Sequence, residues 1–351
     1  MATTTNTPTN LIVLDEAQGE AKDLRPSTAS SSEPSSSTGK PRVLPFARIT
    51  NANCLEFPRE GYPQESRKIE ETSEARARRE RHRALIVPRE HGTWGLLLVP
   101  MITGAGIAFR QASHIVPFIV LSAAALALFW LRTPVESLLG TSAMRAQNAE
   151  EARTVRSAVI LFAGVAAVAL GFLLWAGKNA DLWPLGAAAA AAFIAQALLK
   201  KCGRRFRMLS EMIGIVGLTA SAPAAYYVIT GSFDSTAGML WVANILFAGD
   251  QIHYVQMRLH TAKIVGFRAK LARGWAFAAG QALMTAVLTV ACADRLMPPI
   301  ASIAFAPLLF RGWFYFVQEP NPLIVRRLGW SEMKHAASFC FLLIAAYIIA
   351  R

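Results

Sequence analysis

Two clusters of polar residues interrupt an otherwise apolar chain, and both combine ionisable side chains that could bind a ligand or transfer a proton. The first consists of Arg89, Glu90 and His91, which follow Pro88 at the start of a long apolar segment. Arg89 could hold an anionic head group, and Glu90 or His91 could bind a metal ion or move a proton. The alternative is an interfacial membrane anchor, with the arginine reaching toward the lipid head groups.

The second cluster lies near the end of a later apolar segment and contains Asp250, His253, Tyr254 and Arg258. On a helix, Asp250, His253 and Tyr254 share a face, and Arg258 follows one turn beyond Tyr254. A carboxylate inside a membrane helix stays charged only beside a partner, such as a metal ion, His253 or an arginine from another helix. The cluster could therefore bind a metal–phosphate group or relay protons, and a satisfied structural pair between Asp250 and His253 is the alternative.

Further polar residues occur at or inside other apolar segments. Arg132 stands one helical turn before Glu136, where it could hold a substrate or form a local surface pair. For Arg311, inside a segment near the C-terminus, snorkelling to the membrane surface and a role in a site are both open. Asn244 and Gln281 lie deeper, where amides commonly make hydrogen bonds between helices.

The elements that must position these residues are nine apolar blocks. Hydrophobic residues make up 53% of the 351-residue chain and charged residues 17%, whereas soluble domains carry about a quarter charged residues. A membrane helix needs about 20 residues, so the sequence predicts an all-α, polytopic membrane bundle of about nine transmembrane helices. The blocks span Pro88–Phe109, Ile115–Leu131, Ser157–Trp175, Leu182–Leu199, Met208–Thr230, Thr236–Gln256, Gly274–Cys292, Met297–Val317 and Trp330–Ala350.

The basic residues predict the orientation of these helices. They concentrate before the first block and in every second loop after it, whereas the intervening loops and the C-terminus hold Arg110, Lys178, Arg295 and Arg351. Because basic loops stay on the cytoplasmic side, we expect a multi-pass protein of the cell inner membrane with a cytoplasmic N-terminus. The net charge of +13 belongs to these loops and the N-terminal tail, so nucleic-acid binding is not expected.

The chain is predicted to have two parts. Residues 1–84 include the Ser/Thr/Pro tract Ser27–Thr38, which cannot form a core, and we expect them to be a disordered, polar and charged cytoplasmic tail. Residues 85–351 are the expected nine-helix membrane domain. The four cysteines are isolated along the chain, so neither a disulfide framework nor a zinc site is indicated.

The segment PREHGTWG at residues 88–95 resembles the YwiC-like family of bacterial membrane proteins, in which a P-x-x-H-G-x-W element opens the first helix. We expect the resemblance to extend from Pro88 to Arg351. It implies a membrane protein but brings no specific reaction with it.

The nine blocks and the cytoplasmic N-terminus are also similar to those of the UbiA-like intramembrane prenyltransferases. This resemblance implies an active site that opens to the cytoplasm, where two aspartate-rich motifs after the second and sixth helices hold magnesium on a prenyl diphosphate. The matching stretches here are Arg132–Glu136 and Asp250–Arg258, and their acids are Glu136 and Asp250 alone. Magnesium is thus implied by resemblance, while the runs of aspartates are missing.

Two hypotheses for the function follow. The first is a UbiA-like enzyme that acts on a lipid or isoprenoid substrate at a cytoplasm-facing site. Its residues fall into three groups by role: metal ligands Asp250 and Glu90, catalytic residues His91, Asp250 and His253, and substrate-binding residues Arg89, Glu90, Arg132 and Arg258. The second is a transporter or lipid-binding membrane protein without a catalytic step, which uses the same polar residues. Membrane lipids are expected partners in both.

Overall fold

The computed structural model describes residues 76–86, 91–111, 115–140, 145–176, 182–320 and 323–350, and none of these residues is in a strand. The chain divides into two compact units, residues 1–61 and 62–351, and all described residues belong to the second. Arg89 and Glu90 lie outside the described residues, and at His91 only the helical backbone is described.

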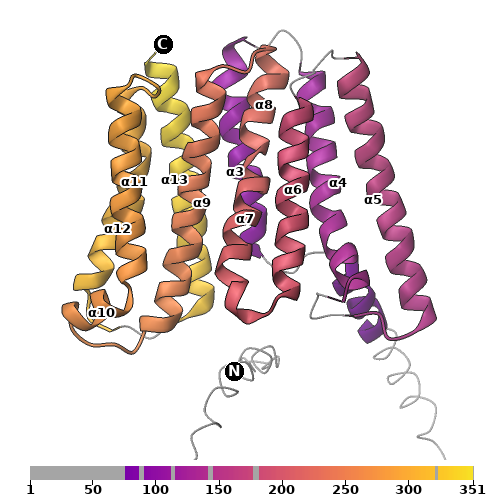
Figure 1. The fold of residues 1–351 in the computed structure, drawn as a ribbon, viewed down its shortest axis with the longest axis horizontal. Coiled ribbons are helices and arrows are strands. Elements are labelled where there is room, and N and C mark those ends of the chain that lie inside the picture. Colours follow the sequence, from indigo (N-terminus) through magenta and orange to yellow (C-terminus); the bar gives the residue numbers. More distant parts are fainter. Residues whose placement is uncertain are drawn as a thin grey trace, which may run out of the picture. The chain divides into compact units, whose positions relative to one another are not determined.

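The second unit is a bundle of long helices that run side by side (Figure 1). Its α-helices are α3 (His91–Ala108), α4 (Val116–Leu138), α5 (Ala149–Ala176), α6 (Leu182–Lys201), α7 (Arg207–Thr219), α8 (Ser221–Thr230), α9 (Ser235–Thr261), α10 (Phe267–Arg273), α11 (Trp275–Ala293), α12 (Ala306–Val317) and α13 (Val325–Ile349). Three short 3-10 helices connect them, η1 (Phe109–Gln111), η2 (Arg204–Phe206) and η3 (Pro299–Phe305).

Each predicted apolar block coincides with a helix or with two consecutive helices, since α7 and α8 share one block and η3 and α12 another. In the described part of the chain, seven segments are long and apolar enough to cross a membrane, which supports a multi-pass membrane protein. They are Val116–Leu138, Ala149–Trp175, Leu182–Lys201, Arg207–Thr230, Trp275–Ala293, Pro299–Val317 and Val325–Ile349. Helices α3 and α9 are not among them, so a total of nine crossings stays a prediction.

Several helices extend beyond their apolar blocks. Helix α4 continues past Leu131 to Leu138, and α9 continues past Gln256 to Thr261. Polar residues that the apolar blocks excluded, such as Arg132 and Arg258, are therefore on helices. A hydropathy pattern marks only the part of a helix that suits hydrocarbon, whereas the helix itself can continue into the head-group region.

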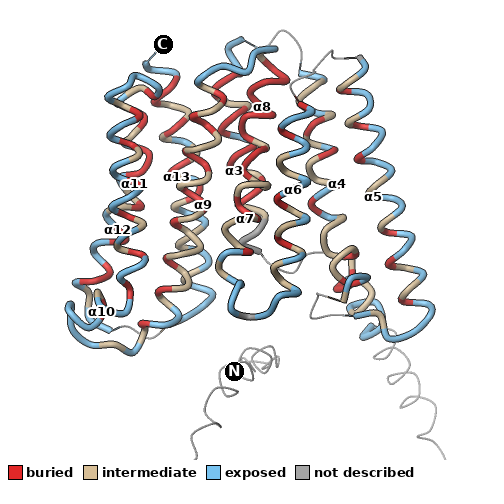
Figure 2. Tube along the Cα trace, in the orientation of Figure 1, coloured by how far each residue is buried: buried red, intermediate tan, exposed pale blue. Residues whose placement is uncertain are grey.

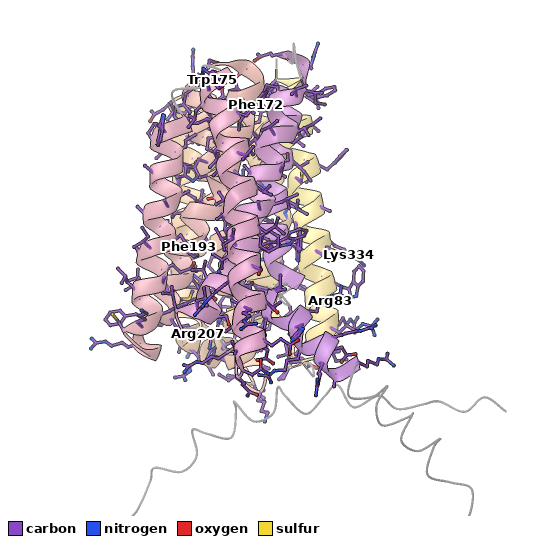
Figure 3. All side chains as sticks on the ribbon, turned by 90° about the vertical axis from the view of Figure 1, so that its right-hand side faces the viewer. Arg83, Phe172, Trp175, Phe193, Arg207 and Lys334 are labelled. Atoms are coloured by element: carbon purple, nitrogen blue, oxygen red, sulfur yellow. The ribbon has the colours of Figure 1, made fainter. Side chains whose placement is uncertain are left out.

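The alternating direction of the helices gathers the basic segments at one end of the bundle, which we call the basic end. It comprises the C-terminal ends of α4, α6, α9 and α12, the N-terminal ends of α5, α7, α11 and α13, and helix α10 (lower end in Figure 1). Figure 3 shows Arg83 and Arg207 toward this end and Phe172 and Trp175 toward the opposite one. The arrangement matches the predicted charge alternation, and the assignment of the basic end to the cytoplasm stays a prediction.

The core lies around α3, α8 and α9, where buried residues are concentrated, whereas exposed and half-buried residues predominate on the outer helix α5 (Figure 2). Helix α3 packs against α8 and α13, α4 packs against α5, and all of α8 from Ala222 to Ile229 is buried. On α5, by contrast, Ile160, Val168 and Trp175 are 73%, 75% and 90% exposed. Exposed large apolar residues along an entire helix are expected where lipid tails replace water.

Close packing of α3 depends on small residues. A Cβ atom on Gly104 would lie 2.1 Å from the carbonyl oxygen of Ala222 in α8, and one on Gly106 would lie 2.6 Å from the Cδ1 atom of Ile344 in α13. Apart from the backbone of its own helix, no described atom lies within 4 Å of the corresponding position at Gly95. Glycine thus permits the backbone approach that commonly joins membrane helices, and it does so in the second half of α3.

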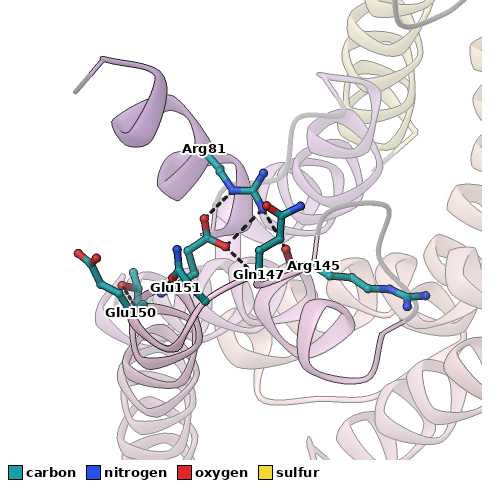
Figure 4. A network of polar contacts seen from close by, with 7 residues as sticks. Arg81, Arg145, Gln147, Glu150 and Glu151 are labelled. Atoms are coloured by element: carbon teal, nitrogen blue, oxygen red, sulfur yellow. Dashed lines mark hydrogen bonds and ion pairs between the residues drawn. The ribbon is translucent and has the colours of Figure 1, made fainter. Parts of the chain in front are cut away.

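Residues 76–86 form a helix that is joined to the start of α5 (Figure 4). The Nε atom of Arg81 donates to a carboxylate oxygen of Glu151 at 2.5 Å, and the same carboxylate accepts a hydrogen bond from the backbone of Gln147 at 2.7 Å. Leu85 is 1% exposed. The predicted boundary after residue 84 falls inside this helix.

We predict that Gly104→Ala destabilises the protein, because the added methyl group meets a backbone oxygen that cannot rotate away. Overpacking of this kind costs about 1–3 kcal/mol. The matched control is Gly164→Ala on α5, where nothing lies within 4 Å and alanine should gain up to about 1 kcal/mol through helix propensity. Unfolding of both variants in detergent micelles checks this, and equal stabilities would show that α3 and α8 do not meet at Gly104.

We also predict that α3 and α9 cross the membrane. In a variant without native cysteines, single cysteines at the exposed positions Arg83 and Val265 should react with an impermeant thiol reagent from one side of the membrane. Cysteines at the exposed positions Gln111 and Ser232 should react from the other side. If Ser232→Cys and Val265→Cys were labelled from the same side of the membrane, α9 would not cross the membrane.

Candidate functional site

A buried network of charged and amide side chains joins four helices toward the basic end. The Nη2 atom of Arg311 on α12 donates to the Oδ2 atom of Asp250 on α9 at 2.6 Å, and its Nη1 atom donates to Glu332 on α13. Gln281 on α11 donates to the other carboxylate oxygen of Asp250. Asp250 is 8% exposed and Arg311 is 9% exposed. We call these four residues the Arg311 network.

The network identifies the partner of the buried carboxylate. Of the partners considered from the sequence, an arginine from another helix is the one that contacts Asp250. His253 is half-buried on α9, and no hydrogen bond between it and Asp250 occurs in the described part of the chain. The amides of Gln281 and Asn244 were expected to form hydrogen bonds between helices, and both do. Gln281 donates to Asp250 on α9, and Asn244 donates to Thr103 on α3 at 3.1 Å.

The described residues do not fit the magnesium ion that the UbiA resemblance implies. Both carboxylate oxygens of Asp250 already accept hydrogen bonds, from Arg311 and Gln281. Among the described residues, no group of three or more His, Cys, Asp and Glu side chains could hold a metal ion. Magnesium usually binds through one or two carboxylates together with water and phosphate oxygens, and here it would have to displace Arg311. We therefore derive no step through a metal at Asp250.

A cavity of 750 Å³ lies beside the network at the basic end, between α3, α4, α6, α7, α9 and α13. Part of its wall is apolar, formed by Leu96, Ile215, Leu218, Ile252 and Val255. The rest is polar or charged, formed mainly by Arg132, Gln196, Lys200, Arg207, Ser210, Glu211, Gln251, Gln256 and Glu332. Such a lining suits a molecule with an apolar body and a polar head group.

Among the described residues, the α4 and α6 side of the cavity carries an excess of positive charge. Arg132 Nε lies 3.0 Å from Glu136 Oε1, and Lys200 Nζ lies 2.6 Å from the same oxygen. Two cations thus share one carboxylate. The remaining pair in the wall, Arg207 and Glu211 at 3.2 Å, is balanced.

The α13 side of the cavity carries an excess of negative charge among the described residues. Glu332 lines the cavity and also belongs to the Arg311 network, in which one guanidinium serves two carboxylates. The Oε1 atom of Glu332 is buried and has no hydrogen-bond partner among the described residues. Buried polar atoms normally have partners, so this oxygen is an unsatisfied acceptor in a residue of the cavity wall.

The predicted site residues therefore lie in different places. Arg132 lines the cavity. Asp250 does not line the cavity but belongs to the Arg311 network, which includes the cavity residue Glu332. His253 does not line the cavity. Arg258 lies over the ring of Tyr315 on α12, 4.7 Å from its centroid.

Lys200 and Glu332 line the cavity, and the sequence pattern alone does not single out either residue. The signal for Glu332 is a carboxylate inside the apolar block Trp330–Ala350, near its start. Its pairing with Arg311, across 21 positions of sequence, needs the fold.

We predict that Arg311→Met destabilises the protein strongly, because it leaves Asp250 and Glu332 as buried carboxylates without a cation. Breaking a buried ion pair by removing one partner typically costs about 3–5 kcal/mol. Arg327→Met, at an exposed position of the same C-terminal region, should change the free energy of unfolding by no more than about 0.5 kcal/mol.

The triple change Asp250→Asn, Arg311→Met and Glu332→Gln should recover part of the loss, because it removes all the buried charges together. Unfolding in mixed micelles measures each value. A stability of Arg311→Met equal to that of Arg327→Met would mean that the network does not form.

Comparison with known proteins gives one match. Residues 87–226 match the family model described as YwiC-like protein, a range that includes the P-x-x-H-G-x-W element, α3 to α7 and the first part of α8. No curated protein and no solved structure matches the chain. The matched range supplies the α3, α4, α6 and α7 walls of the cavity, while α9 and α13 lie beyond it. The predicted resemblance is confirmed over residues 87–226, where this multi-pass membrane protein is similar to the YwiC-like family, and its extension to Arg351 stays a prediction.

Proposed function

We propose that the protein binds an amphiphile in the cavity at the basic end and holds or moves it without a covalent step. The single observation that carries the proposal is the composition of the cavity wall. Apolar residues, an excess cation and an excess carboxylate all line one cavity of 750 Å³. Ligand-binding pockets commonly have volumes of about 300–1,000 Å³.

The charges in the wall favour a head group that contains both signs. An anionic group would bind near Arg132 and Lys200, whose shared carboxylate neutralises only one of them. A cationic or hydrogen-donating group would bind the unpartnered oxygen of Glu332. A phosphoethanolamine head group has this combination, and Leu96, Ile252 or Val255 would contact its chains.

The arrangement gives less support to a prenyltransferase. That reaction would need carboxylates to share the charge of magnesium and diphosphate, and Asp250 already has two protein partners. We also propose that the basic end faces the cytoplasm of the cell inner membrane, because basic segments are retained there. The substrate would then enter from the cytoplasmic leaflet.

We predict that Lys200→Gln weakens binding of a short-chain phosphatidylethanolamine by about ten- to hundredfold, as expected for loss of one charged hydrogen bond. Lys201→Gln provides the matched control, because Lys201 is the next residue of α6 but is exposed and does not line the cavity. Titration calorimetry in a nonionic detergent measures both affinities. Equal losses, or none, would contradict binding in the cavity.

Two further assays separate the possible activities. Purified protein in vesicles should exchange phosphatidylethanolamine between leaflets or retain it as a bound lipid, and neither outcome should change the lipid covalently. Release of diphosphate from a prenyl diphosphate in the presence of magnesium, abolished by Asp250→Asn, would instead establish the enzymatic function and overturn the proposal.

A further inference from the structure

A second group of cations lies outside the cavity, where α9, α10 and α12 meet. Lys270 on α10 is 1% exposed, and its Nζ atom lies 4.8 Å from the centroid of the Tyr315 ring on α12. The guanidinium of Arg258 on α9 lies 4.7 Å from the same centroid. Two positive charges therefore share one aromatic ring.

Neither cation forms an ion pair with any described carboxylate. The ammonium group of Lys270 donates to the backbone carbonyl of Gln318 at 2.5 Å, and the Nε atom of Arg258 is buried without a hydrogen-bond partner among the described residues. Burial, and then the nearby charge of Arg258, lower the pKa of Lys270. Cation–π contact compensates only partly for the removal of a charge from water.

The neighbouring Arg311 differs from these two cations because carboxylates neutralise its charge. Arg311 also lies over a tyrosine ring, 4.0 Å from the centroid of Tyr254, but two carboxylates neutralise it. Arg258 and Lys270 have the same kind of aromatic support and no counter-ion among the residues that the structure describes. The hydroxyl of Tyr315 is already bonded to Thr261 at 2.7 Å, so it does not supply the negative charge.

We propose that Arg258, Lys270 and the ring of Tyr315 form a binding site for a phosphate-bearing anion, separate from the cavity. A phosphate group carries one to two negative charges and accepts hydrogen bonds from both a guanidinium fork and an ammonium group. It would bond the guanidinium group of the half-buried Arg258 and neutralise both cations. Neither cation lines the cavity, so this site does not depend on the function proposed for the cavity.

The surroundings place the site where phospholipid head groups would be accessible. Helix α10 lies at the basic end (Figure 1), and Phe267, Arg268 and Trp275 around it are exposed. Aromatic and basic side chains of this kind gather at membrane interfaces. The phosphate could therefore come from an anionic lipid head group or from free phosphate, which share the chemistry that the site recognises.

The test is the thermal stability of the full chain with two phosphate sources. Inorganic phosphate is added to protein in nanodiscs of neutral lipid, with sodium chloride of equal ionic strength as the reference, and phosphatidylglycerol is included in a second set of nanodiscs. At a ligand concentration about ten times the dissociation constant, the melting temperature of the protein should rise by about 2–4 °C. A rise with phosphatidylglycerol alone identifies a lipid site, and a rise with both identifies a site for phosphate in general.

Lys270→Met and Arg258→Gln should each lose this rise, while Arg268→Gln, at an exposed position on α10, should retain it. Arg258 is only half-buried, so its variant provides the result if Lys270→Met does not fold. Lys200→Gln should also retain the rise, which separates this site from the cavity. The absence of a rise with either source, or an equal rise in Arg258→Gln, overturns the proposal.

Discussion

The structure depends most on a charge that is buried inside the helix bundle. Arg311 lies 9% exposed inside the bundle, and it is stable there only because Asp250 and Glu332 reach it from two other helices. Gln281 adds a fourth helix through its bond to Asp250. A buried cation and its acids must be satisfied together, so this network fixes the relative positions of α9, α11, α12 and α13. These helices form the part of the bundle that lies beyond the YwiC-like match.

The same network determines the character of the cavity, because Glu332 belongs to both. In the described part of the basic end, cations and carboxylates are paired unequally: two cations share Glu136, two carboxylates share Arg311, and neither Arg258 nor Lys270 is paired with a carboxylate. Each buried charge that lacks a partner of opposite sign destabilises the protein unless a ligand of opposite charge binds to it. The first two imbalances flank the cavity and favour a head group of mixed charge, whereas the third lies apart and favours an anion.

The sequence predicted the features that depend on local pattern. Apolar runs located the helices, and the alternation of basic loops anticipated that Arg132, Lys200 and Arg258 would gather at one end. The depth of Asp250 indicated a buried partner. The identity of that partner could not be predicted, because Arg311 is 61 residues away and only helix packing brings it near. Lys270 likewise stood in a loop of basic residues, and its burial follows from the way α10 folds against α12.

The central claim is that the cavity, completed by Glu332 of the Arg311 network, receives an amphiphile. An experimental structure in nanodiscs that contain phosphatidylethanolamine tests this most directly. We expect density for an acyl chain along Leu96, Ile252 and Val255, with the head group between Lys200 and Glu332 and with Arg311 still bonded to Asp250. A cavity filled by rearranged side chains, or a metal ion bound to Asp250 with Arg311 displaced, would contradict the account.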